Sequence, residues 1–131
     1  MSAETDCIFC RIVAGEIPSF KLFEDEHTFA FMDINPANEG HALVVPRQHV
    51  ASIYQLSAEE QNALWTLVAN VRNRLSDDLA PQGFNIGLND GESAGQTILH
   101  AHIHIIPRRD GDVNDPRGGV RWIIPEKARY W

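Results

Sequence analysis

Basic residues are scarce in this sequence: 11 lysines and arginines stand against 18 aspartates and glutamates, which gives a net charge of −7 at pH 7. Such an acidic surface repels a duplex phosphate backbone, and this argues against a protein that coats DNA or RNA. A small phosphorylated ligand stays compatible, because the field inside a pocket can differ in sign from that of the whole molecule. The charge therefore predicts a small-molecule partner and no nucleic-acid polymer.

Long hydrophobic runs are also missing. No apolar run approaches the roughly 20 residues that a helix needs to cross a bilayer, so no membrane partner is expected. Residues 1–6 are acidic and lack the basic and apolar regions of a signal peptide. We therefore expect a cytoplasmic protein.

Repeats and low-complexity tracts are absent as well, which favours one domain over residues 1–131. The hydrophobic share of 44% and the charged share of 22% are typical of a globular protein. A chain of this size buries about two thirds of the surface that it exposes when unfolded. It is long enough for one sizeable core and too short for two.

The elements expected from the sequence are one long helix and several short strands. Ser57 and Glu60 form a capping box, and a stripe of leucines and valines follows it until Pro81. A short helix is expected over residues 7–14, where Gly15 offers a stop. Strands are expected over residues 20–23, 28–32, 41–45, 84–88, 99–106 and 120–124. This order predicts an α+β fold with a mostly antiparallel sheet.

The strongest functional signal lies in residues 100–106, which read His-Ala-His-Ile-His-Ile-Ile. Side chains alternate along a strand, so His100, His102 and His104 are expected in one row, with the apolar residues on the other face. Imidazoles carry polar nitrogens that need partners, which makes a filler role improbable. The spacing alone leaves open an exposed polar face or three ligands of a metal such as zinc. The preceding glycine-containing loop favours a functional site, because backbone amides in such loops bind phosphate.

This pattern resembles the His-φ-His-φ-His-φ-φ signature of the histidine triad (HIT) superfamily of nucleotide hydrolases and transferases. Residues 40–49 (Gly-His-Ala-Leu-Val-Val-Pro-Arg-Gln-His) resemble the family's second motif, and residues 89–97 resemble its phosphate loop. Residues 7–18, which begin Cys-Ile-Phe-Cys, are similar to its N-terminal segment. The resemblance covers about residues 7–110 and leaves residues 111–131 as a C-terminal extension. It implies a HIT-like fold, in which a mostly antiparallel sheet of about five strands accompanies one long helix and a short N-terminal helix.

The resemblance implies nucleophilic catalysis at phosphorus. The family's central histidine, His102 here, attacks the α-phosphate of a nucleotide and forms a nucleotidyl-histidine that water then hydrolyses. A neutral imidazole is a competent nucleophile near pH 7, which agrees with this role. His104 corresponds to a donor toward the phosphate oxygens, and His41 joins the histidine network from the adjacent strand. No catalytic metal is required at the reacting phosphorus.

The resemblance also assigns the substrate contacts. Asp33 matches the acidic residue that accepts both ribose hydroxyls, a task that suits an acceptor-only carboxylate. Without the resemblance it would be read as a turn residue. The apolar wall around the base is assigned to residues that would otherwise be placed in the core, namely Phe9, Ile17, Phe31 and Ile34. Phosphate contacts are assigned to Asn89, Gly95, Gln96 and Thr97.

The two cysteines, Cys7 and Cys10, are too close in sequence for a useful disulfide, because the bridge would close almost no loop. One Cys-x-x-Cys supplies only half of a tetrahedral zinc site. In HIT proteins of the bacterial type, two histidines that match His49 and His100 complete the site. The resemblance thus implies a structural, non-catalytic Zn²⁺ on these four residues. Two buried thiols without a ligand are the alternative.

The implied activity is that of a nucleotide-binding hydrolase or nucleotidyl transferase acting at the α-phosphate of purine, and specifically adenosine, nucleotides. Nucleoside phosphoramidates are the expected Hint-like substrates, favoured by the zinc-type N-terminus and the spacing from Asp33 to His41. Residues 94–97 and 107–112 resemble the Fhit branch, which cleaves dinucleoside polyphosphates. A nucleotide-binding regulatory module with little turnover is the third reading.

Two further expectations concern assembly and the extension. Family members are commonly homodimers, and a homodimer is expected here. In the extension, Arg121 or Trp122 is expected to shape the preference for the leaving group. The alternative is that Trp122 and Trp131 only bury area.

Overall fold

The computed structural model describes residues 6–131 of the chain; the acidic residues 1–5, on which the expected cytoplasmic location largely depends, lie outside the described part. Five antiparallel strands form one sheet in the order β1-β2-β3-β5-β4. The strands are β1 (Lys21–Glu24), β2 (Thr28–Met32), β3 (Ala42–Pro46), β4 (Gly83–Gly87) and β5 (Ile103–Arg108). The helices are α1 (Ile8–Val13), α2 (Ala58–Leu79) and α3 (Pro125–Ala128), with the 3₁₀ turns η1 (Ile53–Gln55), η2 (Glu92–Ala94) and η3 (Gly119–Ile123). The α+β prediction is confirmed.

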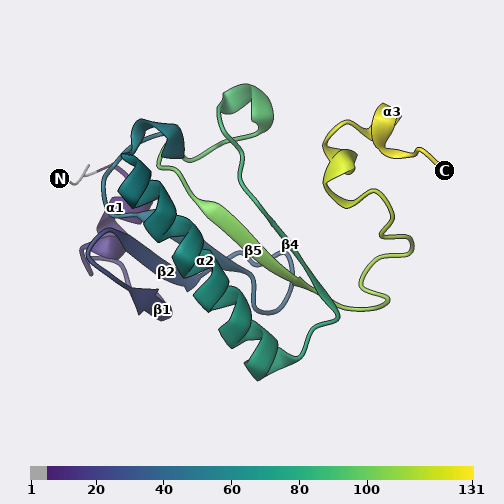
Figure 1. Ribbon diagram of the computed structural model, residues 1–131, viewed down its shortest axis with the longest axis horizontal. Helices are drawn as coiled ribbons and strands as arrows, with labels where there is room; N and C mark the ends of the chain where they lie inside the picture. Colours follow the sequence, from purple (N-terminus) through teal and green to yellow (C-terminus); the bar gives the residue numbers. More distant parts are fainter. Residues whose placement is uncertain (1–5) are drawn as a thin grey trace.

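Helix α2 lies across one face of the sheet (Figure 1). It begins at the predicted capping box, where the Ser57 Oγ accepts from the Glu60 amide and the Glu60 side chain accepts from the Ser57 amide. Its buried stripe is Leu64, Leu67, Val68, Val71 and Leu75. Alternate strand residues complete this layer, among them Ala30, Val44, Ile103 and Ile105. Burial of each large side chain contributes about 1.5–3 kcal/mol, so this layer is the main source of stability.

The opposite face of the sheet carries α1 and the functional side chains. Phe29 and Phe31 of β2 and Leu43 and Val45 of β3 form a second buried cluster, with residues of α1 packed on it. His104 pairs with Leu43 across β3 and β5, so its side chain stands on this same face. The strand alternation thus separates the apolar layer under α2 from the histidine side of the sheet.

Strand β5 begins later than predicted. The sequence predicts a strand from residue 99, but ladder pairing starts at Ile103, so His100 and His102 precede the strand. Pro46 on the neighbouring strand has no N–H to donate, and its carbonyl accepts from the His100 Nε2 at 2.8 Å. The Ala101 amide donates instead to the Val50 carbonyl at 2.8 Å. The histidine row survives because the chain stays extended enough to keep Ala101 in the layer under α2.

Residues 111–131, the C-terminal arm, do not form the predicted strand over residues 120–124. Gly118 and Gly119 have φ angles of +94° and +46°, which turn the chain into η3. The arm is organised by its own contacts: the Trp122 indole donates to the Arg117 carbonyl, and Arg121 donates to the carbonyls of Ala128 and Lys127. Figure 1 shows the arm on the side of the molecule opposite α1. Within the described residues, no helix is long and apolar enough to cross a membrane.

Candidate active site and metal site

His102 lies just before β5 in a fixed tautomer. Its Nδ1 lies 2.9 Å from the His100 carbonyl, and a carbonyl can only accept, so Nδ1 carries the proton. In this tautomer the acceptor nitrogen of the ring is Nε2. Phe9 and His104 each make an edge-on contact with the ring, both at 5.0 Å between centroids. The ring is thus held in orientation, with a lone pair available at Nε2.

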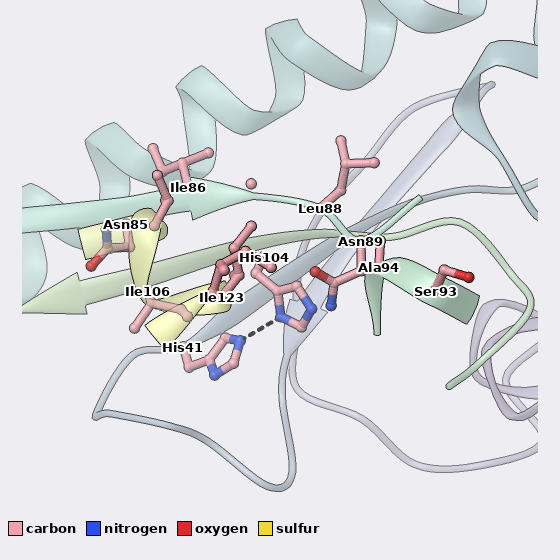
Figure 2. Close-up of a pocket in the computed structure, with 13 residues that line it drawn as sticks. His41, Asn85, Ile86, Leu88, Asn89, Ser93, Ala94, His104, Ile106 and Ile123 are labelled. Atoms are coloured by element: carbon pink, nitrogen blue, oxygen red, sulfur yellow. Dashed lines mark hydrogen bonds between the residues drawn. The ribbon is translucent and has the colours of Figure 1, made fainter. Parts of the chain in front are cut away.

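His41 and His104 form a second ordered pair, marked by the dashed line in Figure 2. The Ala37 amide donates to the His41 Nδ1 at 2.9 Å, so a neutral His41 carries its proton on Nε2. That Nε2 lies 2.9 Å from the His104 Nδ1, to which it donates. Neutral His104 in turn carries its proton on Nε2. The chain of bonds makes the His104 Nε2–H a donor oriented for an anionic ligand.

Burial keeps this histidine pair neutral. Desolvation is the main cause, and the neighbouring His102 and His41 add to it, so that the pKa of His104 is lowered to about 4. The pKa of His41 is also lowered, again chiefly by desolvation, although Asp33 opposes the shift. The Asp33 carboxylate lies 3.6 Å from the His41 Nε2 and is mostly buried. At pH 7 both imidazoles are therefore neutral, as their hydrogen-bond order requires.

A pocket of about 290 Å³ joins most of the residues assigned to substrate contacts. Of the predicted site residues it is lined by Phe9, Phe31, Asp33, Ile34, Asn89, Gly95, Thr97, His102 and His104. It is also lined by residues that the sequence analysis did not single out: Ile8, Ile12, Asn35, Leu43 and Ile98. The four apolar residues carry no chemical signal, because an apolar residue that faces a pocket reads like one that faces the core. Asn35 reads as a turn residue before Pro36.

Gln96 and Ile17 are not among the residues that line this pocket. Gln96 is buried, and its side chain accepts from the Gly91 amide and donates to the carbonyls of Ala51 and Ile98. It therefore braces residues 89–97 from within. Ile17 packs against the cluster beneath α1.

A second pocket, of about 500 Å³, adjoins the same histidines (Figure 2). His41, Asn89 and His104 line it together with Ile86 of β4 and Ile106 of β5. The arm supplies the remaining apolar wall, made of Val120, Ile123 and Ile124. Arg121 and Trp122, which the sequence analysis assigned to the leaving group, are not among its lining residues. His104 and Asn89 border both pockets, so the two volumes meet at the histidines.

Cys7, Cys10, His49 and His100 converge on one point, with their ligand atoms all within 4.8 Å of one another. The Cys7 Sγ lies 3.3 Å from the His100 Nδ1, and the Cys10 Sγ lies 3.4 Å from the His49 Nδ1. His100 donates its Nε2 proton to the Pro46 carbonyl, which leaves Nδ1 unprotonated toward the thiols. Burial lowers the pKa of His100 to about 4, which favours the neutral form that a metal needs. This group could hold a metal ion, and its two sulfur and two nitrogen donors suit zinc.

Comparison with known proteins gives consistent matches. The family described as HIT domain matches residues 14–111. "Protein hit" of Bacillus subtilis is 43% identical over 108 residues, covering 82% of this chain and 74% of that protein. An adenosine 5'-monophosphoramidase of Schizosaccharomyces pombe is 40% identical over 128 residues, covering 94% and 90% of the two chains.

Solved structures agree in fold. A HIT family protein from Bacillus anthracis superposes with a TM-score of 0.77 at 41% identity, covering 82% of this chain and 76% of that one. A Zn-bound histidine triad family protein from Mycobacterium smegmatis gives a TM-score of 0.76 at 35% identity, covering 82% and 78%. With the histidine row, the pocket and these matches together, this chain belongs to the HIT family.

Proposed function

We propose that this protein hydrolyses nucleotides at the α-phosphate through a nucleotidyl-histidine on His102, and that nucleoside phosphoramidates are its substrates. The observation that carries the proposal is the fixed tautomer of His102, which presents an unprotonated Nε2 to a pocket shared with Asp33 and His104. A nucleophile, a diol acceptor and an anion donor thus line one cavity.

The proposed reaction has two displacements. The His102 Nε2 lone pair forms a bond to the α-phosphorus while the bond to the leaving nitrogen breaks. The nitrogen takes a proton from solvent and departs as the amine, and the water that later attacks phosphorus returns a proton to solvent. The Nδ1–H bond to the His100 carbonyl stabilises the positive charge that develops on the ring. The His104 Nε2–H donates to a phosphate oxygen. Water then displaces the Nε2–P bond, releases the nucleoside monophosphate and restores His102.

The pocket beside His104 favours phosphoramidates over dinucleoside polyphosphates. Among residues 6–131, no lysine or arginine lines this 500 Å³ volume, and the arm contributes three apolar side chains to it, Val120, Ile123 and Ile124. A polyphosphate leaving group carries several negative charges and needs cations to replace its hydration. A neutral or apolar amine has no such need. The monophosphoramidase of Schizosaccharomyces pombe, at 40% identity, supports the same substrate class and the adenosine preference.

We propose a structural Zn²⁺ on Cys7, Cys10, His49 and His100. The donor set, the unprotonated His100 Nδ1 and the Zn-bound relative from Mycobacterium smegmatis support it. With four protein ligands the ion would have no open position for substrate. Its role would be structural: it would connect α1 to the segment around His49 and to the segment around His100. Elemental analysis of untagged protein is expected to find about one zinc per chain. A content far below this would leave two buried thiols as the state of the site.

The homodimer and the cytoplasmic location remain predictions. Sedimentation equilibrium of the full chain measures the first, and fractionation of the source cells measures the second. A monomer at micromolar concentration would contradict the expected homodimer.

A competition assay tests the activity. Adenosine 5'-phosphoramidate and a diadenosine polyphosphate are offered together, and the products are resolved for the wild type and for His102→Ala. We expect selective consumption of the phosphoramidate by the wild type and loss of at least about 10³-fold in His102→Ala.

Each other outcome contradicts a different part of the proposal. A preference for the dinucleotide would move the protein to the Fhit-like activity. Turnover that survives in His102→Ala would exclude His102 as the nucleophile. If neither substrate is hydrolysed while nucleotide binding is retained, the result would indicate a regulatory binding module.

A further inference from the structure

The order of the His41–His104 pair depends on a loop outside the sheet. The loop over residues 33–40 carries Ala37, whose amide donates to the His41 Nδ1 at 2.9 Å and thereby selects the Nε2–H tautomer. Only in this tautomer can the neutral His41 donate a hydrogen bond from Nε2 to the His104 Nδ1. A small displacement of Ala37 would release the His41 ring to the other tautomer, which cannot donate to His104.

The loop is fastened to the end of β5 through Asn38. The Asn38 Nδ2 donates to the Pro107 carbonyl at 3.0 Å and to the Asp112 Oδ2 at 2.8 Å. The Asn38 carbonyl accepts from the His41 amide at 3.1 Å. Asn38 therefore connects the backbone next to Ala37, the backbone of His41 and the start of the arm.

Asp112 is itself held by several hydrogen bonds besides the one from Asn38. Its carboxylate accepts from the Arg108 Nε at 2.8 Å and the Arg108 Nη2 at 2.7 Å, and from the Arg109 amide at 3.0 Å. These donors lower the pKa of Asp112, the Arg108 guanidinium most of all. The Arg108 Nη1 also donates to the Asn85 side chain on β4 at 2.6 Å. The Asp112 carboxylate, which accepts the bond from Asn38, is thus connected through Arg108 to β5 and β4. The Asp112 side chain is only 15% exposed.

We propose that Asp112 is a positioning residue for the reaction: through Asn38 it fixes the loop whose Ala37 amide sets the tautomer of His41, and so the donor direction of His104. The inference rests on the proposed function, because it gives Asp112 a part in that same turnover. Asp112 touches neither the pocket of 290 Å³ nor that of 500 Å³. Its effect is therefore expected on the rate of the bound complex more than on binding.

The variants compared are Asp112→Ala, Asp112→Asn, Asn38→Ala and the double variant Asp112→Ala/Asn38→Ala. Asp115→Asn is the matched control, since Asp115 is another Asp paired with an arginine of the arm, Arg117, and has no bond to the loop. The steady-state kinetics of adenosine 5'-phosphoramidate hydrolysis are measured for each. In parallel, ¹⁵N NMR of labelled protein reports which nitrogen of His41 is protonated.

In Asp112→Ala we expect kcat to fall about 10- to 100-fold while KM changes less than about threefold. Asp112→Asn retains an oxygen acceptor for Asn38 and is expected to recover most of this loss. The double variant is expected to be no slower than Asn38→Ala alone, because Asn38→Ala already removes the bond to Asp112 together with the bond to the Pro107 carbonyl. His41 is expected to show only the Nε2–H tautomer in the wild type and in Asp115→Asn, and a mixture in Asp112→Ala.

An unchanged kcat in Asp112→Ala, additive losses in the double variant, or an unaltered His41 tautomer would each overturn the inference. If Asp112→Ala does not fold, the comparison of Asn38→Ala with the wild type decides in the same way. If the wild type itself hydrolyses no phosphoramidate, the proposed function fails, and the NMR comparison still decides whether Asp112 orders His41.

Discussion

His104 combines burial with a task that needs its neutral form. Its pKa of about 4 lies well below the ordinary value of 6.5, so between pH 6.5 and pH 4 the unfolded chain binds more protons than the folded one. Stability contributed at neutral pH is therefore lost as the pH falls through this window. We expect His104→Gln, which cannot titrate, to lose about 2 kcal/mol less stability than the wild type between pH 7 and pH 4.5.

Urea unfolding at several pH values measures this difference. His100 contributes to both proteins alike, because the causes of its pKa shift do not include His104. The difference therefore reports His104 together with the neighbours that shift its pKa, among them its bonded partner His41. Parallel stability curves for the wild type and His104→Gln would contradict the assigned pKa direction.

Gly40 is a second position where one residue controls the site, since it directly precedes His41. Its φ is +87°, and a Cβ there would lie 2.5 Å from the Leu79 Cδ1 and 3.0 Å from the Pro107 Cγ. Gly40→Ala therefore adds a steric clash to the backbone strain, and we expect it to destabilise the fold by about 3 kcal/mol. Gly15 is the matched control: its φ is +81° but nothing lies within 4 Å, so Gly15→Ala is expected to cost only about 1 kcal/mol.

Chemical denaturation of the two variants separates strain from packing. Equal losses of unfolding free energy in the two variants would show that Leu79 and Pro107 move aside without an energetic penalty. A Gly40→Ala protein that also loses turnover out of proportion to its stability would point to displacement of His41.

At the residue scale, spacing predicts chemistry better than it predicts contacts. Alternation alone places His102 and His104 on one face, and the structure brings both to the pocket. The amide of Ala37 could not be found in this way, because every residue carries a backbone N–H and only the folded loop selects one. Gln96 shows the reverse case: its position matches a phosphate contact, but its side chain is bonded to the Gly91 amide of its own loop and to the Ala51 carbonyl of a distant segment.

At the element scale, strong local signals were reliable. The capping box and apolar stripe gave α2 nearly to the residue, and the expected helix over residues 7–14 is confirmed as α1. The start of β5 was wrong because ladder pairing depends on the partner strand, and Pro46 there lacks a donor. The strand expected over residues 120–124 was wrong because an apolar run becomes a strand only beside a free sheet edge, and two left-handed glycines direct this one elsewhere.

The late start of β5 predicts which residues would lose protection from amide exchange when the metal is removed. Residues 100–102 precede the ladder and are held by the bond from Ala101 to Val50, by the bond from His100 to Pro46, and by the proposed zinc. Removal of zinc by a chelator is expected to destabilise the protein by roughly 3 kcal/mol or more. Amide exchange at Ala101 is expected to accelerate far more than exchange at Ile105, which lies inside the ladder.

Hydrogen exchange with and without chelator measures both amides in one sample, and Ile105 serves as the internal control. A uniform change would mean that the metal stabilises the whole domain without holding the His102 segment in particular. Unchanged protection at Ala101 would show that the bond from Ala101 to Val50 and the bond from His100 to Pro46 hold this segment without the metal.

At the scale of the whole molecule, the chain divides into a body, which the HIT-domain match covers up to residue 111, and the arm that follows it. The body buries α2 on one face of the sheet and the reaction pocket on the other, so one sheet supports stability and chemistry on separate sides. The arm adds a wall to the second pocket without joining the sheet. Reaction chemistry is therefore expected to depend on the body, and selection of the leaving group on the arm.

Ile123 tests this division of labour. It lines the second pocket together with Ile86 and Ile106 (Figure 2), whereas the Arg121 side chain donates to carbonyls inside the arm. In Ile123→Ala the loss of apolar wall weakens contact with a bulky apolar amine and leaves the smallest amine unaffected. We expect the ratio of kcat/KM for an arylalkyl phosphoramidate to that for the unsubstituted phosphoramidate to fall about three- to tenfold.

Lys127→Ala is the matched control, because Lys127 lies on α3 of the same arm and lines neither pocket. Its ratio is expected to equal that of the wild type. An equal fall in both variants would attribute the effect to a disturbed arm and not to the wall of the pocket. An unchanged ratio in Ile123→Ala would exclude this wall from leaving-group selection, and would leave that selection to side chains of the body such as Ile86 and Ile106, which face the same volume.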